Sequence, residues 1–347
     1  MPTAENTPEN TVEIPLIDAR QITMPTDGDS AATDAALAAA AEGSGFMRLS
    51  HVDEALGLAP DLRDRVLAFF ALPEAEKFSL SRRKFAPDHA NTYRGYFPLQ
   101  PGSQTYKEGI DIGADAVDAT RIADTDDALL EATPWPRDVP DWREAVATYY
   151  AAMERLGRLI LAGLARGMGV DPRLMTPLFD RSNSTLRMIR YPERSPESMP
   201  EDLSQVSVGG GDPRWIVGGA HTDSGFITLL WQDPNGGLQA ETTDGCWVEV
   251  PPIADGLAVN FGQLLEQWTG GRVRATRHRV LGGLRERVSV PFFYEPAVDA
   301  VIEPLPLAGI APFTPFEYGD FLWEHMSSFV EFQGLERHPG AAQPVEA

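Results

Sequence analysis

The stretch Gly219-Ala220-His221-Thr222-Asp223-Ser224-Gly225, together with the later Thr276-Arg277-His278-Arg279-Val280, decides how this chain is interpreted. Residues two apart on an extended strand point to the same side, so we expect the side chains of His221 and Asp223 to lie together. A second imidazole, that of His278, follows after enough chain to cross a sheet and return. The spacing predicts a metal site whose ligands are His221, Asp223 and His278.

Two histidines and one carboxylate occupy one face of a metal ion and leave the opposite face open, which is typical of non-haem Fe(II) oxygenases. A His-x-Asp pair alone is a weak signal, because it also arises by chance or as a hydrogen-bonded pair on a strand. The pattern gains weight from Arg287-Val288-Ser289, shortly after His278, whose first and third side chains share a face and can bind a carboxylate. The other histidines lack a partner at ligand spacing, and we expect packing or surface roles for His89, His325 and His338.

Composition limits the possible partners. The formal net charge of -22 argues against nucleic acid and anionic membranes, because phosphate binding needs a basic surface. Cys246 is the only cysteine, so neither an intrachain disulfide nor a thiolate metal cluster is possible. The chain shows no secretory signal and no apolar run near the ~20 residues that span a bilayer. We expect a cytoplasmic protein without an obligate protein partner.

The organisation of the chain predicts a mainly β core preceded by helices. We expect six segments: a disordered tail at 1–11, an N-terminal region at 12–120, a connector and long helix at 121–180, the β core at 181–298, a C-terminal helical segment at 299–335 and a disordered tail at 336–347. Apolar residues at three- and four-residue steps predict the long helix at about 141–167, and it is expected to cover a sheet. A final helix is predicted at 316–332.

Short strands separated by Gly, Pro and Asp follow Leu186, and they predict a double sheet or jelly roll. The eight predicted strands are 186–191, 216–221, 226–232, 238–241, 247–250, 257–261, 277–281 and 288–294. Between the first two lies a long segment rich in Pro, Ser, Gly and Asp, at 193–214. We expect this segment to be a mobile cover beside the metal site, since long loops are uncommon unless functional or disordered.

Motifs along nearly the whole chain resemble those of the isopenicillin N synthase-like family of Fe(II)/2-oxoglutarate-dependent dioxygenases. Besides the metal motif and Arg287-Val288-Ser289, the matching stretches are Ile14-Pro15-Leu16-Ile17-Asp18, Gly45-Phe46 through His51, Phe69-Phe70-Ala71-Leu72-Pro73-Glu74-Ala75-Glu76-Lys77 and Tyr191-Pro192. Two positions depart from the family pattern. Ile189 stands where many members have Asn, and Val52 follows His51 where many members have Gly.

The resemblance implies a mixed α/β fold: a distorted double-stranded β-helix, or jelly roll, with helices from the N-terminal half packed on it. It implies Fe(II) held by the three predicted ligands, with 2-oxoglutarate and O2 as cosubstrates. The distal carboxylate of 2-oxoglutarate would pair with Arg287, with hydrogen bonds from Ser289 and Tyr191. Oxidation of a small-molecule substrate, by default its hydroxylation, would release succinate and CO2.

Two alternatives stay open at the level of sequence. An oxidase of the same fold that does not use 2-oxoglutarate would carry the same Arg-x-Ser, and would perform ring closure or desaturation. A metal-free binding protein of this fold is a further alternative, which the presence of all three ligands disfavours. Substrate contacts are assigned to Arg94 and Tyr93, because related enzymes border the mouth of the site with this part of the chain.

Overall fold

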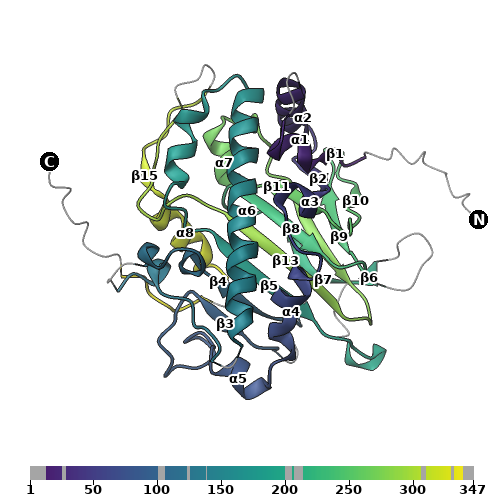
Figure 1. Ribbon diagram of the computed structural model, residues 1–347, viewed down its shortest axis with the longest axis vertical. Coiled ribbons are helices and arrows are strands. Elements are labelled where there is room, and N and C mark those ends of the chain that lie inside the picture. The colour runs from purple at the N-terminus through teal and green to yellow at the C-terminus, as the bar shows by residue number, and fades with distance from the viewer. Residues whose placement is uncertain are drawn as a thin grey trace, which may run out of the picture.

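Two β-sheets packed face to face form the centre of the molecule, and helices cover the outer face of the larger sheet (Figure 1). The computed structural model describes residues 13–25, 29–100, 106–122, 126–137, 139–199, 205–206, 214–305, 310–329 and 332–338. The predicted tail at 1–11 and most residues of the 336–347 tail and of the 193–214 segment lie outside these ranges.

The larger sheet contains eight strands in the order β1-β2-β11-β8-β13-β5-β4-β3. Their bounds are β1 Leu16–Asp18, β2 Phe46–Ser50, β3 Gly95–Phe97, β4 Glu108–Ile112, β5 Thr185–Tyr191, β8 Ile227–Gln232, β11 Leu257–Phe261 and β13 Arg287–Tyr294. Only β1 and β2 pair in parallel. Strands from the first 120 residues lie at both edges, so the N-terminal region and the β core build one sheet together.

The smaller sheet has the order β10-β9-β12-β7-β6 and is antiparallel throughout. Its strands are β6 Gln205–Val206, β7 Arg214–His221, β9 Leu238–Glu241, β10 Trp247–Glu249 and β12 His278–Gly282. A separate pair is formed by β14 Val301–Ile302 and β15 Phe316–Glu317. The eight strands predicted after Leu186 are all present, with ends within two residues of the predicted ones.

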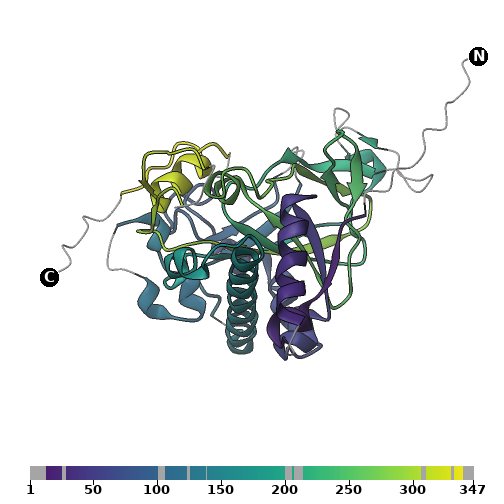
Figure 2. The same ribbon diagram turned by 90° about the horizontal axis from the view of Figure 1, so that it is seen from above.

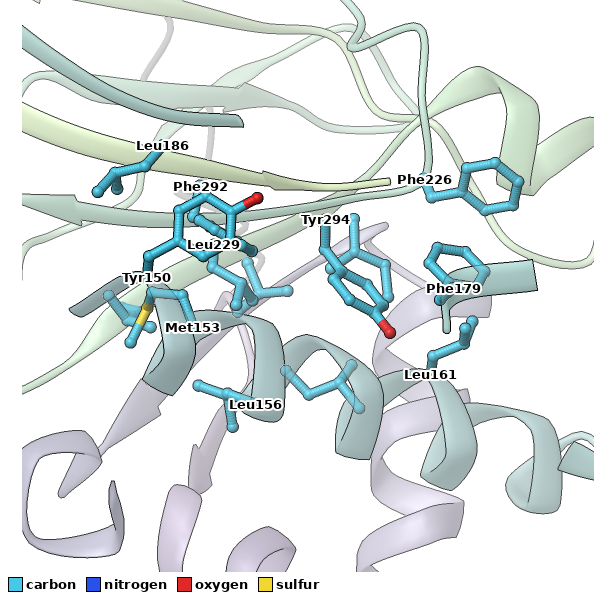
Figure 3. Close-up of a cluster of buried hydrophobic side chains, with 14 of the residues drawn as sticks. Tyr150, Met153, Leu156, Leu161, Phe179, Leu186, Phe226, Leu229, Phe292 and Tyr294 are labelled. Atoms are coloured by element: carbon cyan, nitrogen blue, oxygen red, sulfur yellow. The ribbon is translucent and has the colours of Figure 1, made fainter. Parts of the chain in front are cut away.

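The long helix α6, Pro140–Gly167, packs on the outer face of the larger sheet (Figure 3). Its first residue is a proline, which suits the first turn because that position needs no hydrogen bond from its nitrogen. Tyr150 meets Phe292 edge-to-face with ring centroids 4.9 Å apart. A Cβ added at Gly157 would lie 2.5 Å from the Tyr294 ring, so helix and sheet approach as closely as a glycine allows.

Helix α2, Asp29–Glu42, lies beside α6 on the same side of the sheets (Figure 2). An ion pair between Arg166 and Asp34 joins the two helices, with 2.6 Å between Nε and Oδ2. A Cβ added at Gly167 would lie 2.1 Å from the backbone oxygen of Asp34, so the two helices pack too closely here for any side chain on residue 167. The expectation that helices of the N-terminal half pack on a β core is confirmed.

The remaining helices are short. They are α1 Ala19–Thr23, α3 Val52–Leu56, α4 Leu62–Leu67, α5 Glu74–Phe78, α7 Gln263–Trp268 and α8 Tyr318–Met326, with short 3-10 turns at Ala68–Ala71, Ala114–Ala116, Ala119–Arg121, Ala128–Leu130, Pro172–Leu174, Thr176–Phe179 and Pro196–Ser198. None of the helices in the described ranges combines the length and apolar character needed to cross a membrane.

The final helix is shorter than the predicted 316–332, because α8 ends at Met326. Immediately after it, the hydroxyls of Ser327 and Ser328 donate to the backbone carbonyls of Glu324 and His325, at 2.8 and 2.6 Å. Serine hydroxyls compete for backbone groups in this way, which weakens helix continuation. The apolar spacing alone did not reveal this end.

Candidate metal centre

The register between two strands of the smaller sheet brings the three predicted ligands together. His221 ends β7, Asp223 follows two residues later, and His278 begins β12 directly opposite His221. The Oδ1 atom of Asp223 lies 3.7 Å from Nε2 of His221 and 3.6 Å from Nε2 of His278. The candidate ligand atoms of the three residues all lie within 4.8 Å of one another. Strand pairing therefore assembles the predicted trio around one point.

Backbone carbonyls orient both imidazoles. Nδ1 of His221 lies 2.8 Å from the carbonyl oxygen of Gly219, and Nδ1 of His278 lies 3.2 Å from that of Thr276. A carbonyl oxygen only accepts hydrogen bonds, so each Nδ1 carries the proton and each Nε2 keeps its lone pair. Both lone pairs are thus available on the side where Asp223 lies, as metal ligation requires.

The larger sheet fixes the carboxylate. The Thr228 hydroxyl donates to Oδ2 of Asp223 at 2.5 Å, and the Asn260 side-chain amide donates to the same oxygen at 2.7 Å. Thr228 and Asn260 are paired neighbours on β8 and β11. One carboxylate oxygen is therefore held by the protein, while Oδ1 faces the histidines. Sequence reasoning missed both residues, because nothing near either of them marks a metal site.

The charges around the site favour the protonation states that bind a metal. Burial would raise the pKa of Asp223, but the imidazoles of His278 and His221 and the two hydrogen bonds outweigh it, and the pKa lies below its ordinary value. Burial, followed by the neighbouring His278, lowers the pKa of His221. A deprotonated carboxylate and a neutral imidazole are the ligand forms for a divalent cation. The donor set of two nitrogens and one oxygen fits ferrous iron.

A buried arginine lies at the other end of the inner face of the larger sheet. Arg287 begins β13 opposite Tyr191, the last residue of β5, and its guanidinium carbon lies 5.3 Å from the centre of the tyrosine ring. Nε donates to the carbonyl of Gly236 at 2.6 Å, and Nη1 donates to the Ser289 hydroxyl at 3.1 Å. The strand pairing thus groups Arg287, Ser289 and Tyr191 as the sequence predicted.

No adjacent carboxylate among the described residues balances the charge of Arg287. The residue is 3% exposed, and no carboxylate of the described ranges forms an ion pair with it. Burial lowers its pKa; Asp233 opposes this shift from beyond ion-pair distance. A buried cation without a counter-charge is unfavourable by itself, and an anionic ligand would remove that cost. The surroundings of Arg287 therefore suit a carboxylate from outside the chain.

Next to β5, the side chains that lie between the two sheets are apolar. Ile189 stands opposite Ser289 and clusters with Phe97, Tyr191 and Val217, the last of which belongs to the smaller sheet. The branched side chain of Ile189 occupies the position at which many members of the isopenicillin N synthase-like family have an asparagine. No hydrogen bond to a ligand is available from this side chain.

Arg94 and Tyr93, predicted to touch substrate, lie buried at 1% and 4% exposure. The Arg94 guanidinium binds the Thr185 hydroxyl and the side-chain oxygen of Asn183, the latter at 3.2 Å, and it stacks on Tyr93 at 4.6 Å. These contacts give Arg94 a structural role at the start of β5. A substrate contact from either residue stays a prediction.

His89 and His325, for which packing or surface roles are expected, have backbone carbonyls as hydrogen-bond partners. Nδ1 of His89 lies 2.8 Å from the carbonyl of Ser81, and Nδ1 of His325 lies 2.8 Å from that of Phe321. Neither belongs to the described group of potential metal ligands.

Comparisons with known proteins agree with this geometry. The model of the 2OG-Fe(II) oxygenase superfamily matches residues 182–296, and that of the non-haem dioxygenase in morphine synthesis N-terminal family matches residues 14–141. A 2-oxoglutarate-Fe(II) type oxidoreductase of Emericella nidulans, hxnY, is 32% identical over 76% of this chain and 74% of its own. The chain belongs to the 2OG-Fe(II) oxygenase superfamily. It is an Fe(II)- and 2-oxoglutarate-dependent dioxygenase that uses O2 to oxidise a small molecule, as predicted.

Solved structures confirm the double-stranded β-helix fold. The Neurospora crassa T7H in complex with alpha-KG superposes with a TM-score of 0.74 at 24% identity, covering 92% of this chain and 98% of that one. The dioxygenase for auxin oxidation of rice superposes with a TM-score of 0.65 at 26% identity, covering 91% and 96%. A homoarginine-6-hydroxylase of rice is 28% identical over 89% of this chain and 95% of its own.

Proposed function

We propose that His221, Asp223 and His278 bind the catalytic Fe(II) of this superfamily member. The observation that carries the proposal is the placement of the three ligand atoms within 4.8 Å of one another, with the second polar atom of each residue held by the protein. Such fixation orients the ligands before the metal arrives. When bound, Fe(II) with 2-oxoglutarate supplies the oxidation of an unactivated C–H bond by O2.

Arg287, Ser289 and Tyr191 bind the distal carboxylate of 2-oxoglutarate in this proposal. Arginine suits the role because its planar fork matches a carboxylate and keeps its charge when water is excluded. The hydrogen bonds of Arg287 to Gly236 and Ser289 leave the guanidinium in one orientation. A rigid anchor holds the cosubstrate at a fixed distance from the metal ligands.

Hydroxylation of a small molecule is the outcome that the proposal favours. Relatives named for their reactions include the homoarginine-6-hydroxylase and the dioxygenase for auxin oxidation, both of which act on small molecules. We also propose a cytoplasmic location, since a reducing compartment suits both ferrous iron and the single exposed Cys246. A cover formed by residues 193–214 stays a prediction.

The test compares wild-type protein with Asp223→Ala under anaerobic reconstitution, with His325→Ala as the matched control. We expect one bound Fe(II) per chain and succinate formation from 2-oxoglutarate in wild type and in the control, and neither in Asp223→Ala. Iron binding by Asp223→Ala at wild-type affinity would refute the ligand assignment. Oxygen consumption that needs a primary substrate but no 2-oxoglutarate would instead support the oxidase alternative.

A further inference from the structure

A row of buried side chains on the inner face of the larger sheet contacts two of the proposed iron ligands. Phe46, Asn260 and Thr228 are paired neighbours on β2, β11 and β8, and the side chains of directly paired residues share one face of a sheet. All of them are at most 5% exposed. The ring of Phe46 meets that of His278 edge-to-face, with 5.7 Å between the ring centroids. Asn260 and Thr228 both donate hydrogen bonds to Asp223.

The two polar members of this row bind the same carboxylate oxygen. Oδ2 of Asp223 accepts from Thr228 at 2.5 Å and from Asn260 at 2.7 Å, whereas Oδ1 lies 3.6 Å from Nε2 of His278. A carboxylate oxygen has about two lone-pair sites, so two donors occupy both sites of Oδ2. Only Oδ1 therefore keeps lone pairs for a metal ion.

The strands themselves do not call for these polar side chains. Asparagine is among the residues that strands disfavour. The neighbouring inner-face residues of the same two strands, Ala258 and Leu230, are apolar and pack in the cluster between the sheets. A buried amide and a buried hydroxyl beside them have Asp223 as their common partner. The polar pair is thus explained by the carboxylate that it binds.

The number of carboxylate oxygens that bind a metal ion decides how many of its positions stay open. Carboxylates bind cations through one oxygen or through both. One oxygen of Asp223 and the two imidazoles would leave three positions on an octahedral ion. A 2-oxo acid that chelates through its carboxylate and keto oxygens fills two of them, and one stays open. If Oδ2 also bound, it would compete with the cosubstrate for the third position.

We propose that Thr228 and Asn260 are positioning residues that restrict Asp223 to one metal-binding oxygen and thereby keep a position open for the cosubstrates. The inference rests on the proposed function, because Asp223 has to be an iron ligand for it to hold. It predicts a particular pair of effects. Loss of the two donors should weaken the binding of 2-oxoglutarate but not that of Fe(II), since the freed Oδ2 is itself a ligand for the metal.

The first experiment measures these two affinities separately. Thr228→Val and Asn260→Leu each remove one donor at nearly unchanged side-chain volume, and the double variant frees Oδ2 completely. Anaerobic calorimetry gives the affinity for Fe(II), and then the affinity of the Fe(II)-loaded protein for 2-oxoglutarate. We expect the double variant to bind 2-oxoglutarate at least about tenfold more weakly than wild type, because a hydrogen bond to a carboxylate is worth about tenfold or more. Its affinity for Fe(II) should be equal to that of wild type or higher.

The single variants decide the question if the double variant does not fold, since each should change in the same direction by a smaller factor. Thr228→Ser keeps the hydroxyl and should keep both wild-type affinities. Thr185→Val is the matched control, because it removes a buried hydroxyl of the same sheet that binds Arg94 instead of Asp223, and it should also keep both affinities.

Three outcomes would overturn the inference. If the affinities for 2-oxoglutarate and Fe(II) fall together, Thr228 and Asn260 only support the fold of the site. If neither affinity changes, the two hydrogen bonds do not govern how Asp223 binds the metal. If the affinity for Fe(II) falls alone, they strengthen the metal site without keeping a position open.

The second experiment counts the open positions without any turnover. Mn(II) binds the same nitrogen and oxygen sites as Fe(II), though more weakly. Its effect on the NMR relaxation of water protons reports how many exchangeable waters it carries. We expect one water fewer in the double variant than in wild type, and an equal number would overturn the inference. Failure of wild type to bind Fe(II), Mn(II) or 2-oxoglutarate would instead refute the proposed function itself.

Discussion

The two faces of the larger sheet use the same strands for different purposes. On β13, Phe292 and Tyr294 face α6, and Phe292 is fully buried against Tyr150. Earlier on the same strand, Ser289 and Arg287 face the smaller sheet with polar groups and a charge. Because strand side chains alternate, β13 serves an apolar outer face and a polar inner face at once.

The difference between the faces separates stability from chemistry. The outer face is packed so closely that Gly157 leaves no room for a Cβ beside Tyr294. The inner face carries features that cost stability, such as the buried Arg287 and the buried carboxyl group of Glu295. Substitutions on the outer face should therefore lower stability, and those on the inner face should lower activity.

The largest effect is expected at the iron ligands on the inner side. His221→Ala should abolish tight Fe(II) binding and turnover, because two ligands no longer enclose one face of the ion. The fold should survive, since the His221 side chain is 46% exposed and packs little. Iron stoichiometry and circular dichroism measure the two quantities, with His338→Ala as the control. Full activity in His221→Ala would show that chemistry does not depend on the side chains of the inner face.

On the outer face, Phe292→Ala should lower the free energy of unfolding by about 3–5 kcal/mol, because it opens a cavity between β13 and α6. The activity of the folded fraction should stay near that of wild type. Denaturant unfolding measures the first quantity, and succinate formation per folded chain measures the second. A stable but inactive Phe292→Ala would show that the faces are not independent.

Arg287→Ala should weaken 2-oxoglutarate by roughly thirty-fold to several thousand-fold, since truncation that leaves a buried carboxylate unpaired costs about 2–5 kcal/mol. Iron affinity should not change, and stability without the cosubstrate should not fall, because the variant removes a buried charge. Lysine should rescue only part of the loss, because it lacks the fork. If 2-oxoglutarate is consumed normally while only the primary substrate fails, Arg287 binds that substrate and not the cosubstrate.

Alternation within single strands is the part of this molecule that sequence predicts well. Arg287 and Ser289 lie on one face as the strand repeat predicts, and His221 and Asp223 also lie together, although β7 already ends at His221. The roles of Thr228 and Asn260 depend on how β8 and β11 pair, which local spacing does not determine. Residues whose hydrogen-bond partners come from distant strands therefore could not be predicted from the sequence.

The same limit applies to the ion pairs around Asp111. Arg187 shares Asp111 with Arg82, and these three residues come from segments that meet only in the folded sheet. Likewise, Arg94 stood near Tyr93 in a stretch expected to border the site, yet its hydrogen bonds go to the start of β5. Proximity to a motif in sequence was a poor guide to where the Arg94 side chain lies.

Gly157→Ala tests the close packing of the outer face with a single methyl group. The added Cβ would lie 2.5 Å from the Tyr294 ring, so helix or ring must shift. Overpacking of this kind costs about 1–3 kcal/mol, which exceeds the gain in helix propensity from replacing glycine. Thermal unfolding should show a lower Tm with unchanged iron affinity. A raised Tm would mean that the interface between α6 and the larger sheet has room for the added methyl group.

An effect that depends on pH is expected at Glu295, the residue after β13, whose carboxyl group lies against Gly225, two residues after Asp223. Burial raises its pKa from 4.5 to about 8, with a further contribution from the charge of Asp223. Between these two pH values the unfolded chain releases this proton and the folded chain keeps it, so rising pH favours unfolding.

Glu295→Gln removes the titrating group and should remove this part of the pH dependence. In iron-free protein, the Tm of the variant minus that of wild type should become more positive from pH 5 to pH 8, by a few degrees in total. Below pH 5 the two proteins should be similar, because the wild-type carboxyl group is then neutral in the folded state. A Tm difference that stays constant over this range would show that Glu295 is already ionised at pH 5 and that the inner face tolerates a second buried carboxylate beside Asp223.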